Sequence, residues 1–278
     1  MARVVELITY PIKGCAGVSL TEASLGEAGL PSDRSFMVTD GEGVYRTQRR
    51  HPVLALIRPR VDDDGERLTL TAPGAGELSI GIDTVSARRD VVLFGSPYQG
   101  IDQGDEVAAW LSDALGVGCR LVRVPPEHDR VAAGLTPGTS GYADSNAVHI
   151  VSRSSLDELN RRITDEGGEP LPITRFRPNA VVEGWTEPHT EDRVRRLAIG
   201  DAELGFAKSA VRCVVTTVDQ AKGVKAGPEP LRTLARYRRA PEGGGTLFGT
   251  NFSVIRTGTL AVGDELDVRS WDGPPPAE

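Results

Sequence analysis

Apolar and polar residues alternate over short stretches through the first third of the chain, and these stretches are separated by glycine, proline and aspartate. Alternation with a period of two is typical of half-buried strands, and the separating residues are those that favour turns. The expected strands are 4–8, 18–25, 35–39, 54–61, 68–70, 78–82 and 91–94. The pattern therefore predicts a β-rich N-terminal region.

Helical spacing appears later, in three segments. The first runs over 105–115, with apolar residues on one face. The second begins at Ser154 or Ser155, where Glu158 is placed to complete a capping box. A third helix is expected over 230–237.

Strands resume around these helices, at 120–124, 147–151, 180–182, 194–199, 202–206, 211–218, 252–255 and 266–268. The pattern predicts a β-dominated α+β protein, and 278 residues are enough for two domains. A stretch rich in proline and glycine at 125–141 lies near the expected boundary. We therefore expect domains over 1–123 and 124–272, followed by a loose tail over 273–278.

Composition narrows the function. The chain has 39 acidic and 32 basic residues, a net charge of −7, which disfavours binding to nucleic acid or an anionic membrane. It has no long apolar run and no signal-peptide pattern at its start, so we expect a cytoplasmic protein without a membrane segment. Its three cysteines are too few for a disulfide framework.

Cys213 is the first candidate for a reactive side chain, because Arg212 precedes it and Lys208 lies just upstream. A neighbouring cation favours the thiolate, which is the form that attacks electrophiles or binds a soft metal. A buried structural thiol in a strand is the alternative. Clustered metal ligands and phosphate-binding glycine loops are absent from the sequence.

Arginines and serines form a second group. Arg175 and Arg177 stand two positions apart in the run Arg-Phe-Arg-Pro-Asn, which places both on one side of an extended chain. Their planar guanidinium groups suit a phosphate or another oxyanion. The serines upstream of this run are Ser152, Ser154 and Ser155. A third group, Lys13-Gly14-Cys15 with Asp33-Arg34, on its own indicates a turn with an ion pair.

In this order the segments resemble the MOSC family, the molybdenum-cofactor-sulfurase C-terminal domain, preceded by its β-rich N-terminal partner. The landmarks are Tyr10-Pro11-Ile12-Lys13, Gly29-Leu30-Pro31-Ser32-Asp33-Arg34, Thr47-Gln48-Arg49, Asp144 ahead of Val148-His149-Ile150, Arg175-Phe176-Arg177-Pro178-Asn179, Arg212-Cys213 and Thr216-Thr217-Val218-Asp219. The chain looks most like the bacterial relatives of the mitochondrial amidoxime-reducing component. The resemblance implies an N-terminal β-rich domain packed on a MOSC-type β-barrel with peripheral helices.

The resemblance also implies a pterin-based molybdenum cofactor, with Cys213 as the protein ligand of the metal. The residues that it assigns to the pterin and its phosphate are Lys13, Gly14, Arg34, Ser152, Ser154, Ser155, Arg175, Arg177, Asn179 and Arg212. Relatives usually have serine at the position of Gly14, so we expect a backbone N–H to replace that hydroxyl. Asp219 is expected either to deliver protons or only to order a turn.

Three functions follow from this resemblance. The first is an oxidoreductase that reduces small N-hydroxylated compounds such as hydroxylamines, amidoximes or N-hydroxylated bases. Its electrons would come from a separate ferredoxin, flavoprotein or cytochrome, because the chain lacks the cysteine spacing of an iron–sulfur domain. The second is a sulfur carrier with a persulfide on Cys213, which would need a separate donor because the chain has no room for a pyridoxal-phosphate domain. The third is a module that binds or carries the cofactor without catalysis.

Overall fold

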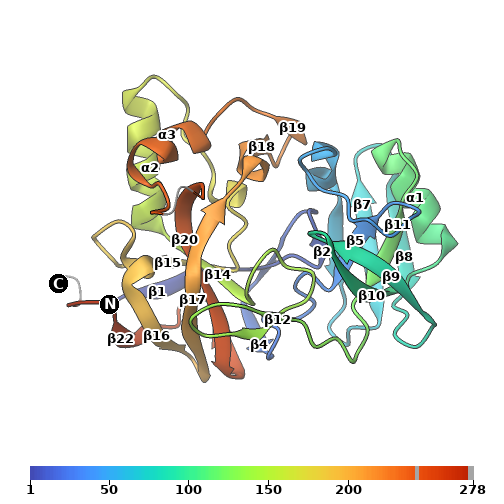
Figure 1. Cartoon of the computed structure of the whole chain (residues 1–278), viewed down its shortest axis with the longest axis horizontal. Helices are drawn as coiled ribbons and strands as arrows, with labels where there is room; N and C mark the ends of the chain where they lie inside the picture. Colours follow the sequence, from blue (N-terminus) through green and yellow to red (C-terminus); the bar gives the residue numbers. More distant parts are fainter. Residues whose placement is uncertain (242–243, 275–278) are drawn as a thin grey trace.

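The computed structural model describes residues 1–241 and 244–274, which form 22 strands and three α-helices (Figure 1). The helices are α1 (Asp105–Leu115), α2 (Arg153–Asp165) and α3 (Leu231–Tyr237). The expected β-dominated α+β class is confirmed. None of the helices in the described part of the chain has the length and apolar character needed to cross a membrane. Of the expected tail, positions 275–278 lie outside the described residues.

The largest sheet has eight strands. In spatial order they are β22 (Leu266–Trp271), β16 (Val194–Ile199), β17 (Ala202–Arg212), β20 (Thr246–Arg256), β14 (Val148–Ser152), β15 (Ala180–Glu183), β1 (Arg3–Thr9) and β3 (Val18–Leu20). Neighbours are antiparallel except for β14 and β15, which are parallel. The first strands of the chain therefore complete a sheet made mostly of its C-terminal half.

The strand ladders do not close this sheet into a barrel, but a few backbone hydrogen bonds connect the start of β1 with the start of β22. The amide of Gly263 donates to the carbonyl of Val4 over 2.9 Å, and the amide of Leu266 donates to the carbonyl of Ala2 over 2.8 Å. The sheet therefore curls back on itself where β1 begins, and these few bonds stand in place of a complete barrel ladder.

The N-terminal half holds the other large sheet, of five strands: β2 (Ile12–Lys13), β5 (Phe36–Thr39), β11 (Arg120–Arg123), β10 (Ser96–Asp102) and β9 (Arg88–Leu93). A three-stranded sheet contains β6 (Arg58–Val61), β7 (Arg67–Ala72) and β8 (Gly76–Gly81). Three pairs complete the fold: β4 (Glu22–Leu25) with β21 (Gly258–Ala261), β12 (Val131–Ala132) with β13 (Gly138–Thr139), and β18 (Val218–Asp219) with β19 (Val224–Lys225). The 3-10 turns are η1 (Pro52–Leu56), η2 (Ile173–Arg175), η3 (Thr190–Arg193) and η4 (Val214–Thr217).

Two buried clusters show how the halves are joined. One packs residues between 2 and 30 with residues between 147 and 266. The other packs residues between 12 and 121, including α1. The two clusters overlap in sequence because the chain starts in the large sheet and then crosses to the smaller one. The division at residues 123 and 124 stays a prediction, and about the first 30 residues contribute to both cores.

Local hydrogen bonds explain where the elements differ from the expected ones. The segment 211–218 is not one strand, because β17 ends at Arg212 and η4 follows. Thr216 Oγ1 donates to the carbonyl of Cys213 over 2.9 Å, and Thr217 Oγ1 donates to that of Val214 over 2.8 Å. Threonine hydroxyls that bond to nearby backbone compete with strand pairing. The expected strand over 54–61 also differs: its first residues belong to η1, and β6 starts only at Arg58.

The start of α2 also differs. Ser152 is its N-cap and accepts a hydrogen bond from the amide of Ser155. With Ser152 as N-cap the capping-box position is Ser155, so Glu158 lies too far along the helix to close a capping box, and its carboxylate pairs with Arg161 and Arg162. The helix therefore begins at Arg153, earlier than the pattern predicted.

His189 gives the fold a specific pH dependence. Burial, and then the charge of Arg238, lower its pKa to about 4, whereas an unfolded histidine titrates near 6.5. The unfolded chain therefore takes up this proton first, and stability present above about pH 6.5 falls by up to about 3 kcal/mol as the pH approaches 4. We expect His189→Asn, which tolerates the positive φ of 64°, to flatten this decline. Urea unfolding at several pH values measures it, and an unchanged slope would contradict the assignment.

Candidate functional site

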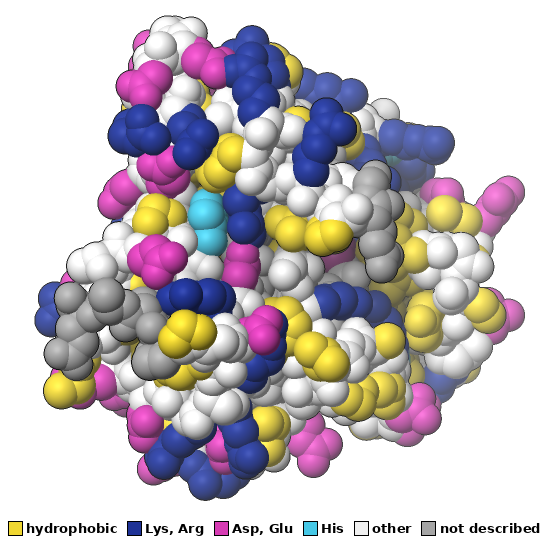
Figure 2. Space-filling model, turned by 60° about the vertical axis from the view of Figure 1, so that its left-hand side comes forward, with side chains coloured by type: hydrophobic (Ala, Val, Ile, Leu, Met, Phe, Trp, Pro, Cys, Tyr) yellow, Lys and Arg dark blue, Asp and Glu magenta, His cyan; other side chains and the backbone are white. Residues whose placement is uncertain are grey.

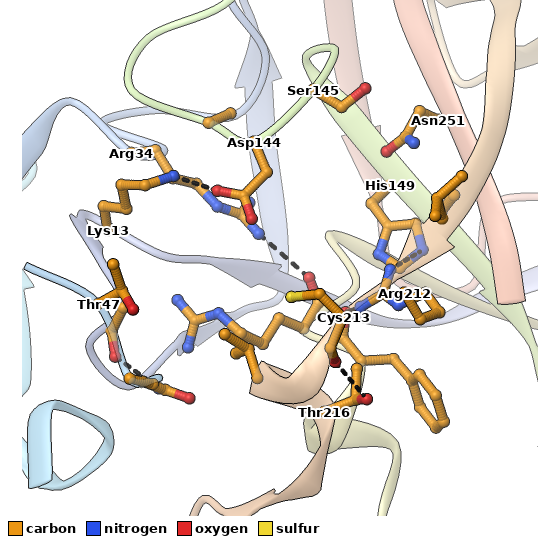
Figure 3. Close-up of a pocket in the computed structure, with 18 of the residues that line it drawn as sticks. Lys13, Arg34, Thr47, Asp144, Ser145, His149, Arg212, Cys213, Thr216 and Asn251 are labelled. Carbon is orange, nitrogen blue, oxygen red and sulfur yellow. Dashed lines mark hydrogen bonds and ion pairs between the residues drawn. The ribbon is translucent and has the colours of Figure 1, made fainter. Parts of the chain in front are cut away.

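A cavity of about 340 Å³ lies between the two halves of the molecule (Figure 3). Its wall is formed by the end of β2, the 45–49 loop before η1, the 143–146 loop before β14, the segment 176–179 and the end of β17. This volume falls in the range of small-molecule sites, which often occur between domains. Strands fixed in two different sheets therefore position one set of side chains.

Cys213 stands at the mouth of the turn that ends β17. It is the N-cap residue just before η4, lines the cavity and is half-buried. The guanidinium of Arg49 lies beside it, and hydrogen bonding to the Cys213 side chain raises the pKa of Arg49. Cys15 and Cys119 differ, because both are buried in the N-terminal core, and burial raises the pKa of Cys15 to about 12. Only Cys213 among the three cysteines lines the cavity.

The wall is strongly cationic although the chain is acidic overall. Seven cationic side chains line the cavity: Lys13, Arg34, Arg46, Arg49, Arg177, Lys208 and Arg212. Asp144 is the one carboxylate among the described lining residues. Such a site attracts an anionic ligand.

Lys13 and Asp144 form an ion pair in the wall of the cavity (Figure 3). Lys13 Nζ also donates to the carbonyl of Tyr142 over 3.0 Å and lies 4.7 Å from the ring centroid of Phe94. Burial lowers the pKa of Lys13, and Asp144 partly offsets this. Enclosure within the cavity opposes ionisation of Asp144, but Lys13 and the nearby arginines lower its pKa to about 2. Asp144 is therefore a carboxylate at neutral pH, and its side chain is 69% exposed because it points into the cavity.

Arg34 and Arg177 share the ring of Tyr10, with guanidinium carbons 4.4 and 4.2 Å from its centroid. Arg34 pairs with the buried carboxylate of Asp33 and donates to the carbonyl of Arg177 over 3.1 Å. Asn179 accepts from Arg34 over 3.0 Å and donates to Asp33 over 3.0 Å. The network fixes two cations close together, an arrangement that a bound anion would stabilise.

Arg212 is a cation without a carboxylate partner in the described residues. Its Nη2 donates to the carbonyl of Phe176 over 2.7 Å, and its Nη1 lies 3.4 Å from Nε2 of His149. Burial lowers the pKa of Arg212 to about 10, and burial and Arg212 hold the pKa of His149 well below its usual range. His149 is therefore neutral and can accept from the guanidinium.

Buried donors in this wall lack partners. Within the described residues, Nη2 of Arg177 and Nε of Arg212 make no hydrogen bond. A buried donor that is left unpaired costs about 1–3 kcal/mol. Both arginines line the cavity, so an acceptor-rich ligand there could satisfy these nitrogens. The arrangement can hold a phosphate or another oxyanion close to the Cys213 sulfur.

Of the site residues expected from sequence, the cavity brings together Lys13, Gly14, Arg34, Arg177, Asn179, Arg212 and Cys213. Gly14 lines it through its backbone, and its carbonyl accepts from Gln48 Nε2 over 2.6 Å. Arg175 is buried outside the lining, with Nη1 3.4 Å from the carbonyl of Thr216. Asp219 also lies outside it and accepts from the amides of Ala221 and Lys222 over 3.0 and 3.1 Å. These contacts give Asp219 a role in ordering its turn.

The three serines lie together at the start of α2, outside the cavity lining. Ser152 Oγ and Ser155 Oγ donate to the buried carboxylate of Glu191 over 2.8 and 2.7 Å. Burial raises the pKa of Glu191. Ser154 Oγ lies 3.4 Å from the carbonyl of Glu187. Their contact with a cofactor stays a prediction, and the structure gives Ser152 and Ser155 the task of satisfying Glu191.

The serines can be tested directly. We expect Ser155→Ala to lower the free energy of unfolding by about 1–3 kcal/mol, because Glu191 loses a donor in a buried site. Cofactor content of the purified protein should not change. Ser154→Ala is the matched control and should stay within about 0.5 kcal/mol of the wild type. Normal stability of Ser155→Ala together with a loss of cofactor would show that the serine binds the ligand instead.

Sequence reasoning did not assign several of the cavity-lining residues to the site, above all Arg49, Asp144, His149 and Asn251. Arg49 and Asp144 belong to landmark segments of the resemblance, and this was a usable signal. His149 also belongs to a landmark segment, and it is buried. Asn251 lies opposite His149 in the β14–β20 pairing, and no local motif marks it.

Comparison with known proteins identifies the family of this chain. The family models of the MOSC N-terminal beta barrel domain and the MOSC domain match residues 1–118 and 137–267. The chain is 36% identical to mitochondrial amidoxime reducing component 2 of Rattus norvegicus, over 96% of this chain and 83% of that protein. It is 34% identical to mitochondrial amidoxime-reducing component 1 of Homo sapiens, over 96% and 82%. It is also 31% identical to molybdenum cofactor sulfurase of Oryza sativa subsp. japonica, over 91% of this chain and 33% of that protein. With both domains matched and these relatives aligned along nearly its whole length, the chain belongs to the MOSC family.

Proposed function

We propose that this protein is a molybdenum-cofactor-dependent oxidoreductase that reduces small N-hydroxylated compounds with electrons from a separate donor protein. The reaction adds two electrons and two protons to an N–OH group, breaks the N–O bond and releases water. Support for this substrate class comes from the relatives named as amidoxime-reducing components.

The observation that carries the proposal is the cationic cavity with Cys213 in its wall. A pterin cofactor with a phosphate needs an oxyanion cradle and a soft protein ligand for its metal, and the cavity offers both. The unpaired nitrogens of Arg177 and Arg212 support this fit, since they are buried donors of lining residues and have no acceptor in the described residues.

The side chains of the cavity divide into a metal ligand and a set of cations that bind the cofactor. When bound, the molybdenum cofactor supplies a two-electron redox centre with a coordination position for the substrate oxygen. Cys213 provides the thiolate for the metal, and the adjacent Arg49 guanidinium stabilises the negative charge on its sulfur. Arg177, Arg212 and Lys13 hold the phosphate and the pterin. The packing of Arg34 and Arg177 against Tyr10 keeps these cations in place before the ligand binds.

Sulfur transfer is the second candidate, and one observation favours it. Cys213 is half-buried in a cavity, so its thiolate could also carry a persulfide. The relative named molybdenum cofactor sulfurase supports this reading, although the chain spans only 33% of that protein.

The first experiment measures molybdenum, pterin and labile sulfur in protein purified from a host that makes the cofactor. An assay then follows the reduction of a simple aryl amidoxime with reduced methyl viologen as donor. Metal near one atom per chain together with amine formation is the expected result. Pterin without metal and without turnover would favour a carrier. Labile sulfur on Cys213 without pterin would contradict the proposed reductase and favour the sulfur-transfer function.

A further inference from the structure

Cations outnumber carboxylates in two surface segments beside Cys213. Residues 46–56 include Arg49 and Arg50 and no acidic residue, and residues 213–226 include Lys222 and Lys225 with Asp219 as their single carboxylate. This excess stands out in a chain with net charge −7. All four lysines of the chain line the cavity or belong to residues 213–226.

These cations are poorly neutralised. Lys222 is 77% exposed and lies 3.9 Å from Asp219, and no ion pair of Arg50 or Lys225 occurs within residues 1–241 and 244–274. Elsewhere the pattern differs: on the outer side of α2, Arg161 pairs with Glu158 and Asp165, and Figure 2 shows positive and negative side chains intermixed on that face. The positive charge near Cys213 is therefore free to attract an acidic partner.

Exposed valines accompany these charges. Val53, Val214 and Val224 are 41%, 48% and 48% exposed, and all three are among the large apolar residues that the fold leaves uncovered. A centre of apolar residues with charges around it is typical of a protein–protein interface. We call the set Arg50, Val53, Val214, Lys222, Val224 and Lys225 the basic–apolar patch.

The two segments of the patch are held against each other. Added to Gly223, a Cβ would lie 2.8 Å from Cγ of Leu56 and 3.3 Å from Cα of Val53, so the β18–β19 turn packs on η1 (Figure 1). The Gln48 and Gln220 side-chain amides bond to each other over 3.0 and 2.9 Å. The part of the patch formed by η1 and the β18–β19 turn is thus preformed. Val214, which directly follows Cys213, is exposed at the start of η4, and η4 contacts β18.

We propose that the basic–apolar patch docks a small acidic one-electron carrier protein, which delivers electrons to the site at Cys213. This inference rests on the proposed function. Charge complementarity would steer such a carrier to the patch and speed association at low salt. A partner seated on Val214 would contact the residue next to the metal ligand, which keeps the path from carrier to site short. A membrane surface fits less well, because the apolar members are short valines on turns rather than large side chains of an amphipathic helix.

The test compares two donors on the full-length, cofactor-loaded protein. One is a small acidic [2Fe–2S] ferredoxin, and the other is reduced methyl viologen. In Lys222→Glu/Lys225→Glu we expect the KM for ferredoxin to rise about ten-fold or more at low salt, with the viologen-driven rate within about two-fold of wild type. Arg256→Glu/Arg269→Glu makes the same charge change on β20 and β22, at the end of the large sheet away from Cys213, and should have little effect on either donor.

Equal effects of the two double variants on ferredoxin, or no effect of either, would overturn the docking proposal. If viologen drives no turnover in the wild type, the proposed function fails instead. Titration of ferredoxin onto the protein then decides docking separately, with weaker binding of Lys222→Glu/Lys225→Glu as the expected result. A third outcome is that the wild type binds anionic phospholipid vesicles but not ferredoxin, and that Lys222→Glu/Lys225→Glu loses the vesicle binding. The patch would then be a membrane-binding surface, and the docking proposal would be wrong.

Discussion

The Cys213→Ser variant is expected to fold normally and to lose the metal. Serine keeps the size of the side chain but replaces a soft thiolate, which binds transition metals well, by a hydroxyl that is not ionised at neutral pH. Molybdenum content should fall at least about ten-fold. Amidoxime reduction should fall at least about 100-fold, because an interaction worth about 3 kcal/mol or more is lost at the reacting centre. Metal analysis and the viologen-driven assay measure the two effects.

Stability separates this loss from misfolding. Cys213 is half-buried at the edge of the cavity, so the melting temperature of cofactor-free Cys213→Ser should stay close to wild type. Cys119→Ala is the matched control: Cys119 is 6% exposed in the N-terminal core, so this variant should lose stability and keep its metal. Full activity of Cys213→Ser would remove the metal-ligand assignment.

The sequence singled out Cys213 because its signal is local; the structure shows that this residue lines the cavity, and its role as a metal ligand stays a prediction. An arginine, a cysteine and a downstream pair of threonines are adjacent in the chain, and in the structure they form the end of β17 and η4. The alternation of apolar residues likewise located most strands. It could not tell which strands pair, and so could not show that β1 joins β15 in the C-terminal sheet.

Residues that act through distant partners were harder to assign. Ser152 and Ser155 were expected to contact an oxyanion, together with the arginines that follow them in the sequence. In the structure their hydroxyls donate to Glu191, more than thirty positions away. Arg49 reaches Cys213 only because the N-terminal half packs beside the end of β17. Arg175 and Arg177 stand two positions apart, yet η2 ends at Arg175, and only Arg177 lines the cavity. A turn between them replaces the extended chain on which both would face the same way.

The Arg212→Met variant is expected to separate ligand binding from stability. Burial disfavours the charged guanidinium of Arg212, which lowers its pKa to about 10. The cation therefore weakens the cofactor-free fold at neutral pH, and an anion that binds beside it relieves this cost. Methionine fills a similar space without charge, so the free energy of unfolding without ligand should not decrease. Affinity for inorganic phosphate, and cofactor content, should fall about ten- to 100-fold, since a hydrogen bond to a charged group contributes about 1.5–3 kcal/mol.

Arg175→Met is the matched control for that experiment, because it removes the same charge from another buried arginine that does not line the cavity. Thermal melting with and without millimolar phosphate compares the two variants. Phosphate should raise the melting temperature of wild type and Arg175→Met but not that of Arg212→Met. A lost phosphate response in Arg175→Met as well would extend the cradle to Arg175, as the family resemblance implies. A normal response in Arg212→Met would show that its unpaired nitrogen does not face the anion, and that Arg177 and Lys13 hold the phosphate without it.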